Sequence, residues 1–238
     1  LMIFSFNKSK SRAVWHGFSL KWYRMLLEDE NIIHSLQVTL AVSLLAALLA
    51  TILGTLAAIG IFNMTRHRRR LIMMNPDIIL GVSLMLMFIF MAQALHLRMF
   101  RLGFLTLLIA HITFDTPYVI LSVMPKLRQI DSKQYEAARD LGATIFQAYR
   151  YIIFPQILPG VITGAILSFT LSIDDVVVSY FTSGPSTETL GVIIFGMTRR
   201  RVSPEINALC TLMFAVVLFL LLIINFRELK NAKEREDS

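Results

Sequence analysis

Long apolar runs separated by short polar segments dominate this chain. Five runs approach the roughly 20 residues that a helix needs to cross about 30 Å of hydrocarbon at about 1.5 Å per residue. They cover residues 36–62, 71–95, 104–124, 157–181 and 208–226. The pattern predicts an all-α fold, a polytopic bundle of transmembrane helices.

A shorter apolar stretch, residues 1–6, precedes the first run. It is too short to span a bilayer, and it lacks the charged segment and cleavage site of a signal peptide. We interpret it as the tail of another spanning helix, which predicts five full spans here plus the stub of a sixth at the N-terminus. We expect residues 1–238 to form a single transmembrane domain.

Composition supports a membrane location. Hydrophobic residues make up 55% of the chain and charged residues only 16%, so a soluble domain of this size could not bury the apolar surplus. The net charge of +7 does not indicate nucleic-acid binding, because the basic residues lie between apolar runs. The single cysteine, Cys210, lies inside a run, which excludes a disulfide framework and a Cys/His metal cluster.

The positions of Lys and Arg predict the orientation, since positive residues in short loops stay cytoplasmic. Basic residues follow the first run, fill residues 126–150 after the third run, and recur in the tail after the fifth. We therefore expect a multi-pass protein of the cytoplasmic membrane with a cytoplasmic C-terminus. Residues 7–35 then form an external segment, in which Trp15 and Trp22 fit interfacial anchors.

The segment 125–159 contains helix start and stop signals without enough apolar length to span. Asp131 can cap a helix with Gln134 reaching back to it, and Gly142 stands where a left-handed C-terminal cap belongs. These signals predict a short helix over residues 132–141.

A second capping pattern follows in the same segment. Thr144 pairs with Gln147, and Pro155 suits the first turn of the next span. We predict a compact helix-turn-helix on the cytoplasmic side. Such a hairpin can dock onto a partner protein or rest on lipid headgroups.

Acidic residues occur inside the apolar runs, where each costs on the order of 2.5–3.5 kcal/mol at the bilayer centre unless it faces a bundle interior or a water-filled path. Asp115 lies roughly 16 Å into its run, at about 1.5 Å per residue. Asp174 and Asp175 interrupt another run, and Asp77 follows Pro76.

Two interpretations of these carboxylates are open. In the first interpretation, the carboxylates stabilise a cationic substrate in a translocation path, and at least one of Asp174 and Asp175 lines that path. Alternatively, this pair caps helices or binds residues such as Arg199. Adjacent residues on a regular helix point about 100° apart, so both cannot line one path if the helix is regular.

The cytoplasmic segment resembles a known family. Glu136-Ala137-Ala138, followed at fixed spacing by Gly142, Ile152 and Phe154-Pro155, is similar to the EAA loop of binding-protein-dependent ABC importer permeases. The resemblance implies a type I ABC importer permease fold in which this short helix is the coupling helix, seated in a cleft of an ATP-binding subunit. The implied ATPase-coupling residues are Glu136, Ala137, Ala138 and Gly142.

The resemblance extends along the chain. Residues 75–78, 111–114 and 172–179, with Gly184-Pro185, look like the PotC-type permeases of spermidine/putrescine importers. The family implies two permease chains, two ATPase subunits and an external polyamine-binding protein. It associates polyamine uptake with positions that here hold Trp15, Asp77, Glu136, Ser172, Asp174 and Asp175. Asp115 joins the expected path because of its depth.

Several motifs are absent from the sequence. Without a Gly-x-x-x-x-Gly-Lys-[Ser/Thr] loop, ATP and Mg²⁺ are expected on a partner ATPase chain, with no cofactor bound here. The histidines, among them His111, are scattered and expected to be structural or interfacial, so no metal site is predicted. We expect a transport subunit rather than an enzyme. The alternatives are a permease for another cationic or small solute, a membrane enzyme using paired carboxylates, and a non-transporting scaffold.

Overall fold

The computed structural model describes residues 5–8, 16–62, 77–200, 207–212, 214, 215 and 218. Within these residues the regular elements are helices, with one isolated β-bridge between Asn7 and Phe18. The chain divides into two units, one made of Leu1–His34 and Ile193–Ser238 and the other of Ser35–Val192. The all-α prediction is confirmed.

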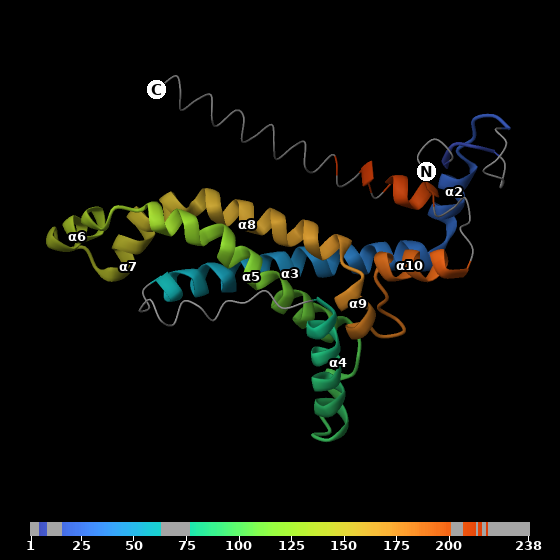
Figure 1. Ribbon diagram of the computed structural model, residues 1–238, viewed down its shortest axis with the longest axis horizontal. Coiled ribbons are helices and arrows are strands. Elements are labelled where there is room, and N and C mark those ends of the chain that lie inside the picture. Colours follow the sequence, from blue (N-terminus) through green and yellow to red (C-terminus); the bar gives the residue numbers. More distant parts are fainter. Residues whose placement is uncertain are drawn as a thin grey trace. The chain divides into compact units, whose positions relative to one another are not determined.

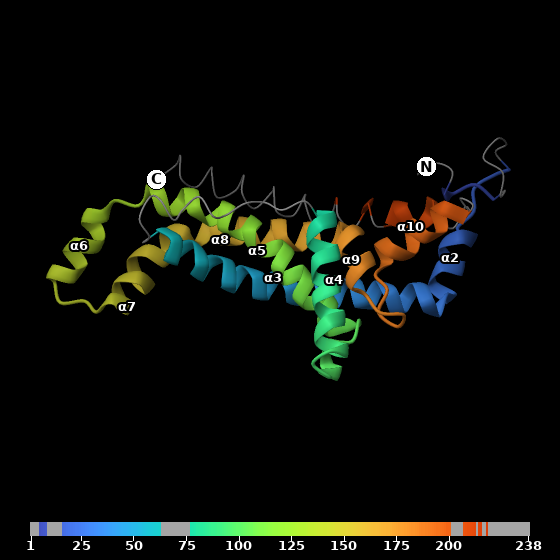
Figure 2. The same cartoon turned by 60° about the horizontal axis from the view of Figure 1, so that its bottom comes forward.

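Most of the helices belong to the larger unit, where α5 and α8 run side by side (Figures 1 and 2). In chain order the helices are α2 (Lys21–Glu28), α3 (Glu30–Phe62), α4 (Asp77–Gln93), the 3₁₀-helix η2 (Arg98–Phe100), α5 (Phe104–Gln129), α6 (Ser132–Asp140), α7 (Ile145–Ala148), the π-helix η3 (Tyr149–Ile153), α8 (Phe154–Asp174), α9 (Val177–Thr182) and α10 (Leu190–Arg200).

Among the described residues, three helical stretches are long and apolar enough to cross a membrane, namely α3, α5 and the continuous stretch Ile145–Asp174. They agree with the predicted runs 36–62 and 104–124 and with most of 157–181. The structure corrects the last run, which is not one helix but breaks after Asp174. An aspartate at the break binds the start of the next helix, so the apolar pattern alone did not indicate where the helix ends.

The other two predicted spans are only partly described. Within 71–95 the structure describes α4, which has 17 residues. Within 208–226 it describes residues 208–212, 214, 215 and 218 as helical. Helix α4 ends at Gln93, two residues before the predicted end of its run. Residues 71–76, the other positions of 208–226 and the N-terminal residues 1–4 lie outside the described part of the chain.

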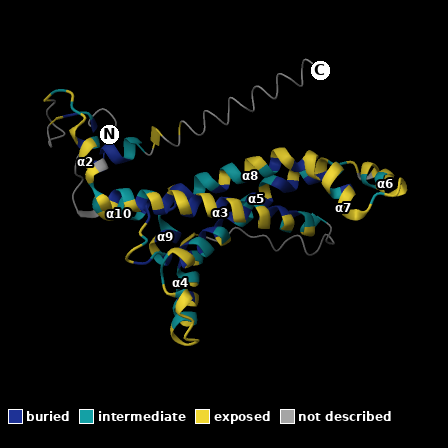
Figure 3. Ribbon diagram, turned by 180° about the vertical axis from the view of Figure 1, so that it is seen from behind, coloured by how far each residue is buried: buried dark blue, intermediate teal, exposed yellow. Residues whose placement is uncertain are grey.

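Helix α3 is apolar on both of its faces. Val42, Ala46 and Ala50 are buried on one side. The opposite side carries exposed apolar residues at every fourth position, which gives α3 alternating bands of burial and exposure (Figure 3): Leu44, Leu48, Ile52 and Leu56. A helix that is apolar all round is stable when its outer face meets hydrocarbon or another apolar helix. The exposed stripe of α3 is therefore the property expected of a membrane span.

Glycines allow α3, α5 and α8 to approach one another closely. A Cβ atom placed on Gly54 of α3 would lie 2.7 Å from the Val119 Cβ of α5, and one on Gly160 of α8 would lie 2.9 Å from the Ser122 carbonyl oxygen. Apolar side chains between the three helices complete the core, including Ala50, Ala58, Val119, Val123, Leu127, Ile153 and Ile157. Lipid gives no hydrophobic drive for helices to associate, so small residues that permit such close contact carry much of the stability.

The predicted hairpin is present with shifted boundaries. Pro125 lies inside α5, which continues to Gln129, so the break from the preceding span comes later than residue 125. Proline removes one backbone hydrogen bond, a loss that membrane-helix interiors tolerate when neighbouring groups compensate. At the other end, α7, η3 and α8 join into one 30-residue helical stretch. The second arm of the hairpin is thus the start of the next span.

The smaller unit contains a buried tryptophan rather than an interfacial one. Trp22 on α2 is buried, and its indole Nε1 donates a hydrogen bond to the Asn7 carbonyl oxygen at 2.7 Å. Phe6 stacks on Phe18 beside it. The interpretation of Trp22 as an anchor in the headgroup region is therefore corrected, because its polar atom is satisfied within the protein. Trp15 lies outside the described residues.

The α5–α8 contact generates a stability prediction. Replacing Gly160 with leucine should push α8 away from the Ser122 backbone and destabilise the fold by about 1–3 kcal/mol, the usual cost of overpacking a close contact. Gly60→Leu is the matched control, because a Cβ on Gly60 meets no atom within 4 Å. The midpoint of thermal unfolding in detergent measures both variants, and equal midpoints would contradict the predicted close packing.

Candidate functional site

The break between α8 and α9 concentrates polar groups inside an apolar part of the chain. Helix α8 ends at Asp174, Asp175 adopts an extended conformation, and α9 begins at Val177. The Asp175 carboxylate accepts hydrogen bonds from the backbone N–H groups of Val178 at 3.2 Å and Ser179 at 2.7 Å. A helix start leaves N–H groups without partners, and a capping carboxylate satisfies them. Asp175 therefore makes the break possible.

His111 of α5 joins the two helices that meet at the break. Its Nδ1 lies 2.6 Å from the Ser172 Oγ in the last turn of α8, and its Nε2 lies 3.0 Å from the Ser179 Oγ in α9. The same Nε2 is 3.7 Å from an Asp175 carboxylate oxygen. The imidazole is only 1% exposed, so these contacts are made away from solvent.

Asp115 lies one helical turn after His111 on α5 and is fully buried. Among the described residues neither carboxylate oxygen makes a hydrogen bond of good geometry, and the buried Ser168 hydroxyl is the polar side chain close enough to interact with it. Leaving such a group unsatisfied costs about 1–3 kcal/mol or more. A polar group kept at that cost is a candidate for function.

The remaining predicted path residues lie near this cluster or outside the described part of the chain. Asp174 is exposed at the end of α8, whereas Ser172 is buried against His111. Asp77 is exposed in the first turn of α4 and, like Asp115, lies within electrostatic range of the Tyr118 phenol. The structure thus brings Asp77, Asp115, Ser172 and Asp175 into one region. It does not describe Trp15.

Sequence reasoning missed two members of this cluster, His111 and Ser179. His111 was expected to be structural or interfacial because no other histidine lay at metal-ligand spacing. Its buried position between two serines gives it a specific partner on each side. The signal available in the sequence was a histidine within an apolar run, one turn before Asp115. Among the described residues no group of three or more His, Cys, Asp or Glu could hold a metal ion.

The hairpin of α6 and α7 follows the predicted capping pattern with one correction. The Gln134 side chain does not reach back to Asp131 but accepts a hydrogen bond from the Gln156 amide at 2.8 Å. The Asp131 carboxylate accepts a hydrogen bond from the Lys133 N–H and starts α6. Gly142 has a φ of +89°, the left-handed conformation that favours glycine after a helix. Thr144 and Gln147 form the expected capping box at the start of α7. The short helix predicted over residues 132–141 is confirmed to within one residue.

The expected coupling residues lie on the surface of this hairpin. Glu136, Ala137 and Gly142 are exposed, and Ala138 is half-buried. Two large apolar side chains next to them are also exposed, Leu141 at 90% and Phe146 at 75%. Exposed apolar residues beside charged ones are typical of a surface that binds another protein.

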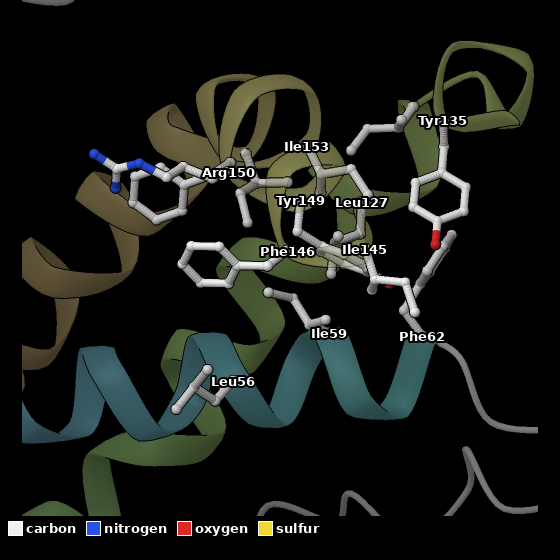
Figure 4. A pocket seen from close by; sticks show the side chains of 13 residues that line it. Leu56, Ile59, Phe62, Leu127, Tyr135, Ile145, Phe146, Tyr149, Arg150 and Ile153 are labelled. Atoms are coloured by element: carbon white, nitrogen blue, oxygen red, sulfur yellow. The ribbon is translucent and has the colours of Figure 1, made fainter. Parts of the chain in front are cut away.

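An apolar pocket of about 900 Å³ opens between the hairpin and the ends of α3 and α5 (Figure 4). Leu56, Ile59 and Phe62 line it from α3, and Tyr135 lines it from α6. Arg150 is the charged residue of its lining. The pocket therefore lies between the hairpin and the C-terminal ends of α3 and α5.

The apolar helices, the polar break between two of them and the exposed hairpin define a multi-pass membrane permease. Residues 34–227 match the family described as "Binding-protein-dependent transport system inner membrane component". The chain belongs to this family.

Individual relatives agree with this assignment. The putrescine transport system permease protein PotI of Escherichia coli strain K12 is 40% identical over 227 residues, covering 91% of this chain and 80% of the relative. The spermidine/putrescine transport system permease protein PotC of Haemophilus influenzae is 40% identical over 237 residues, covering 95% of this chain and 88% of the relative.

Solved structures share the fold. A bacterial ABC transporter involved in import of the acidic polysaccharide alginate matches with a TM-score of 0.66 and 18% identity, covering 93% of this chain and 85% of that one. A second structure of an alginate transporter, in complex with a periplasmic protein bound to alginate pentasaccharide, matches with a TM-score of 0.67 and 17% identity over 88% of this chain and 81% of that one. The type I ABC importer permease fold is confirmed.

The cap at the helix break leads to a prediction. Asp175→Ala removes both acceptors at the start of α9 and should destabilise the protein by about 0.5–2 kcal/mol. Asp175→Asn keeps one oxygen acceptor and should therefore lose less stability than Asp175→Ala. Thermal unfolding in detergent distinguishes the two variants, and equal stability of Asp175→Ala and wild type would contradict the capping role.

Proposed function

We propose that this chain is the permease subunit of an ATP-driven importer that moves polyamines such as spermidine and putrescine across the cytoplasmic membrane. The observation that carries the proposal is the 40% identity over 95% of the chain to a spermidine/putrescine permease. The carboxylates of Asp77 and Asp174 are the second support. Both are exposed at the ends of apolar helices, next to apolar segments where an uncompensated negative charge is costly.

The proposed path matches the chemistry of a polyamine. Such a molecule carries several ammonium groups along an apolar methylene chain, so it needs carboxylates where it loses hydration and aromatic or apolar surface between them. Asp174 and Asp77 are the first carboxylates to meet it, and buried Asp115 is reached when the helices separate. Ser172 supports the wall of the path, and Trp15 belongs to its outer part by family resemblance.

Asp175 has a different role from Asp174 in this proposal. Both of its carboxylate oxygens bind backbone N–H groups of α9, so it shapes the path and adds negative potential to it. Asp174 keeps its carboxylate exposed and free to face a substrate. On a regular helix Asp174 and Asp175 would point in different directions and could not both contribute to one path. Because the helix breaks after Asp174, this restriction does not apply.

The proposed importer contains further chains. A second permease chain completes the pathway, an external polyamine-binding protein delivers the substrate, and a pair of ATPase subunits binds ATP and Mg²⁺. The hairpin and the C-terminus face the cytoplasm in this arrangement, as the basic residues predict.

Energy enters through the hairpin. Glu136, Ala137, Ala138 and Gly142 form the contact with an ATPase subunit, and exposed Leu141 and Phe146 add apolar area to it. Because α7 and η3 continue into α8, a movement of the hairpin is transmitted along that helix to the break at Asp174. ATP binding closes the ATPases and opens the bundle outward, and release to the cytoplasm follows hydrolysis.

Substrate transport tests the path assignment. Asp174→Asn should reduce ATP-dependent uptake of labelled spermidine and putrescine into proteoliposomes about tenfold or more, because an ammonium group loses its charged partner. The vesicles contain the chain with its ATPase, second permease and binding protein. Glu188→Gln is the control, since it removes an exposed carboxylate in the loop after α9 that the proposal does not use.

The outcomes of this assay separate two failures. If the wild type takes up another cationic solute but no polyamine, the assignment as a permease stands and the assignment of polyamines as its substrate is rejected. Normal polyamine uptake by Asp174→Asn would reject the role of Asp174 while leaving the transport function in place.

Coupling gives a separate prediction. Glu136→Ala should leave the complex assembled but reduce substrate-stimulated ATP hydrolysis and uptake together, because the contact that transmits movement is weakened. Co-purification of the ATPase with the permease measures assembly, and phosphate release measures hydrolysis. Full stimulation of hydrolysis with normal uptake in Glu136→Ala would contradict the coupling role, and Glu188→Gln again serves as the control.

A further inference from the structure

Helix α9 is too short to determine its own direction. It has six residues, and isolated helices shorter than about 12–15 residues are marginal even in favourable sequences. Asp175 satisfies its first N–H groups, but a cap at one end leaves the angle between α8 and α9 unspecified. Contacts with the neighbouring helices must set that angle.

Helix α5 makes two hydrogen-bonded contacts with α9. At one end, His111 Nε2 lies 3.0 Å from the Ser179 hydroxyl. At the other end, the Thr106 hydroxyl lies 3.0 Å from the Thr182 carbonyl oxygen and can donate a hydrogen bond to it. His111 differs from Thr106 because its other nitrogen binds Ser172 of α8 at 2.6 Å.

The hydrogen-bonding capacity of imidazole suits this bridge. A neutral imidazole donates through one nitrogen and accepts through the other, while a serine hydroxyl can do either. Both bonds therefore form in either tautomer, with no polar atom of the ring left unsatisfied. A phenyl ring of similar size would fill the space without holding either serine.

We propose that His111 is a positioning residue of the permease, which fixes the angle between α8 and α9 and thereby places the Asp174 carboxylate in the substrate path. Asp174 is the last residue of α8, two residues after Ser172, so its direction depends on how the break is held. His111 acts through Ser172 and Ser179 and does not itself touch the substrate. The part of this inference that concerns substrate rests on the proposed function.

A distance measurement tests the positioning role without any substrate. Spin labels are placed at Ile162 on α8 and Tyr180 on α9, two exposed positions, in a Cys210→Ser background that removes the single native cysteine. Pulsed electron paramagnetic resonance on the assembled complex in lipid nanodiscs gives the distribution of distances. We expect a broader or displaced distribution in His111→Phe and recovery of the wild-type distribution in His111→Gln, whose amide both donates and accepts.

Transport kinetics provide the second readout, on chains without labels. His111→Phe should raise the KM for spermidine about tenfold while basal ATP hydrolysis and co-purification of the ATPase stay at wild-type levels. His111→Gln should restore most of the loss. Thr113→Val is the matched control, because it removes a hydroxyl of α5 that bonds to Ile109 within its own helix.

A milder variant keeps the test decisive if His111→Phe does not fold. Ser179→Ala removes one of the two bonds of the bridge and should shift the distance distribution and the KM in the same direction. An unchanged distance distribution in His111→Phe would overturn the proposal. If His111→Phe does not fold, an unchanged distribution in Ser179→Ala would overturn it. A changed distribution with an unchanged KM would also overturn it. Absence of polyamine uptake in the wild type would reject the proposed substrate, while the distance measurement would still decide whether His111 holds the break.

Discussion

Backbone hydrogen bonding is the constraint on which the rest of this structure depends. In hydrocarbon no water is available for an unpaired N–H or C=O group, so a membrane chain must satisfy its backbone internally. Continuous helices meet this requirement along α3, α5 and α8. The break after Asp174 would violate it, and the Asp175 carboxylate supplies the missing acceptors. The break between α8 and α9 is thereby stabilised, and Asp174 beside it remains exposed.

Close helix packing has a related cause. Helices surrounded by lipid gain little from the hydrophobic effect when they associate, so contact distance matters more than apolar area. Gly54 and Gly160 let α5 approach α3 and α8 at backbone distance, and the polar cluster forms on α5 between the other helices. His111 and Asp115 occupy buried positions there because the surrounding helices leave no route to solvent.

The two functional regions lie at opposite ends of one continuous helix. The hairpin side begins at Ile145 and the polar break follows Asp174, with helical backbone throughout. The π-helix η3 and Pro159 are the points where this stretch can bend, and the regular part of α8 after them keeps its internal hydrogen bonds. The same element therefore carries both the proposed contact with the ATPase and the proposed contact with the substrate.

Much of the architecture was predictable. Apolar length identified the spans α3 and α5, and capping residues identified α6 with Asp131 and Gly142, because these signals depend only on neighbours along the chain. The end of α8 was not predicted, because it depends on which atoms the Asp175 carboxylate binds rather than on the neighbouring residues along the chain. Apolar residues continue on both sides of Asp174 and Asp175, and a hydropathy pattern does not distinguish a capping carboxylate from one that lines a path.

The sequence by itself determined that this is a polytopic helical membrane protein with a capped hairpin between two of its spans and carboxylates in its apolar runs. Apolar length, charge position and capping chemistry are local properties, so they can be read without coordinates. Only the tertiary structure decided that Asp175 caps α9, that Asp174 remains exposed, and that His111 joins Ser172 to Ser179. These contacts span more than 60 residues of chain in the case of His111, and helix packing alone brings such distant groups within hydrogen-bonding distance.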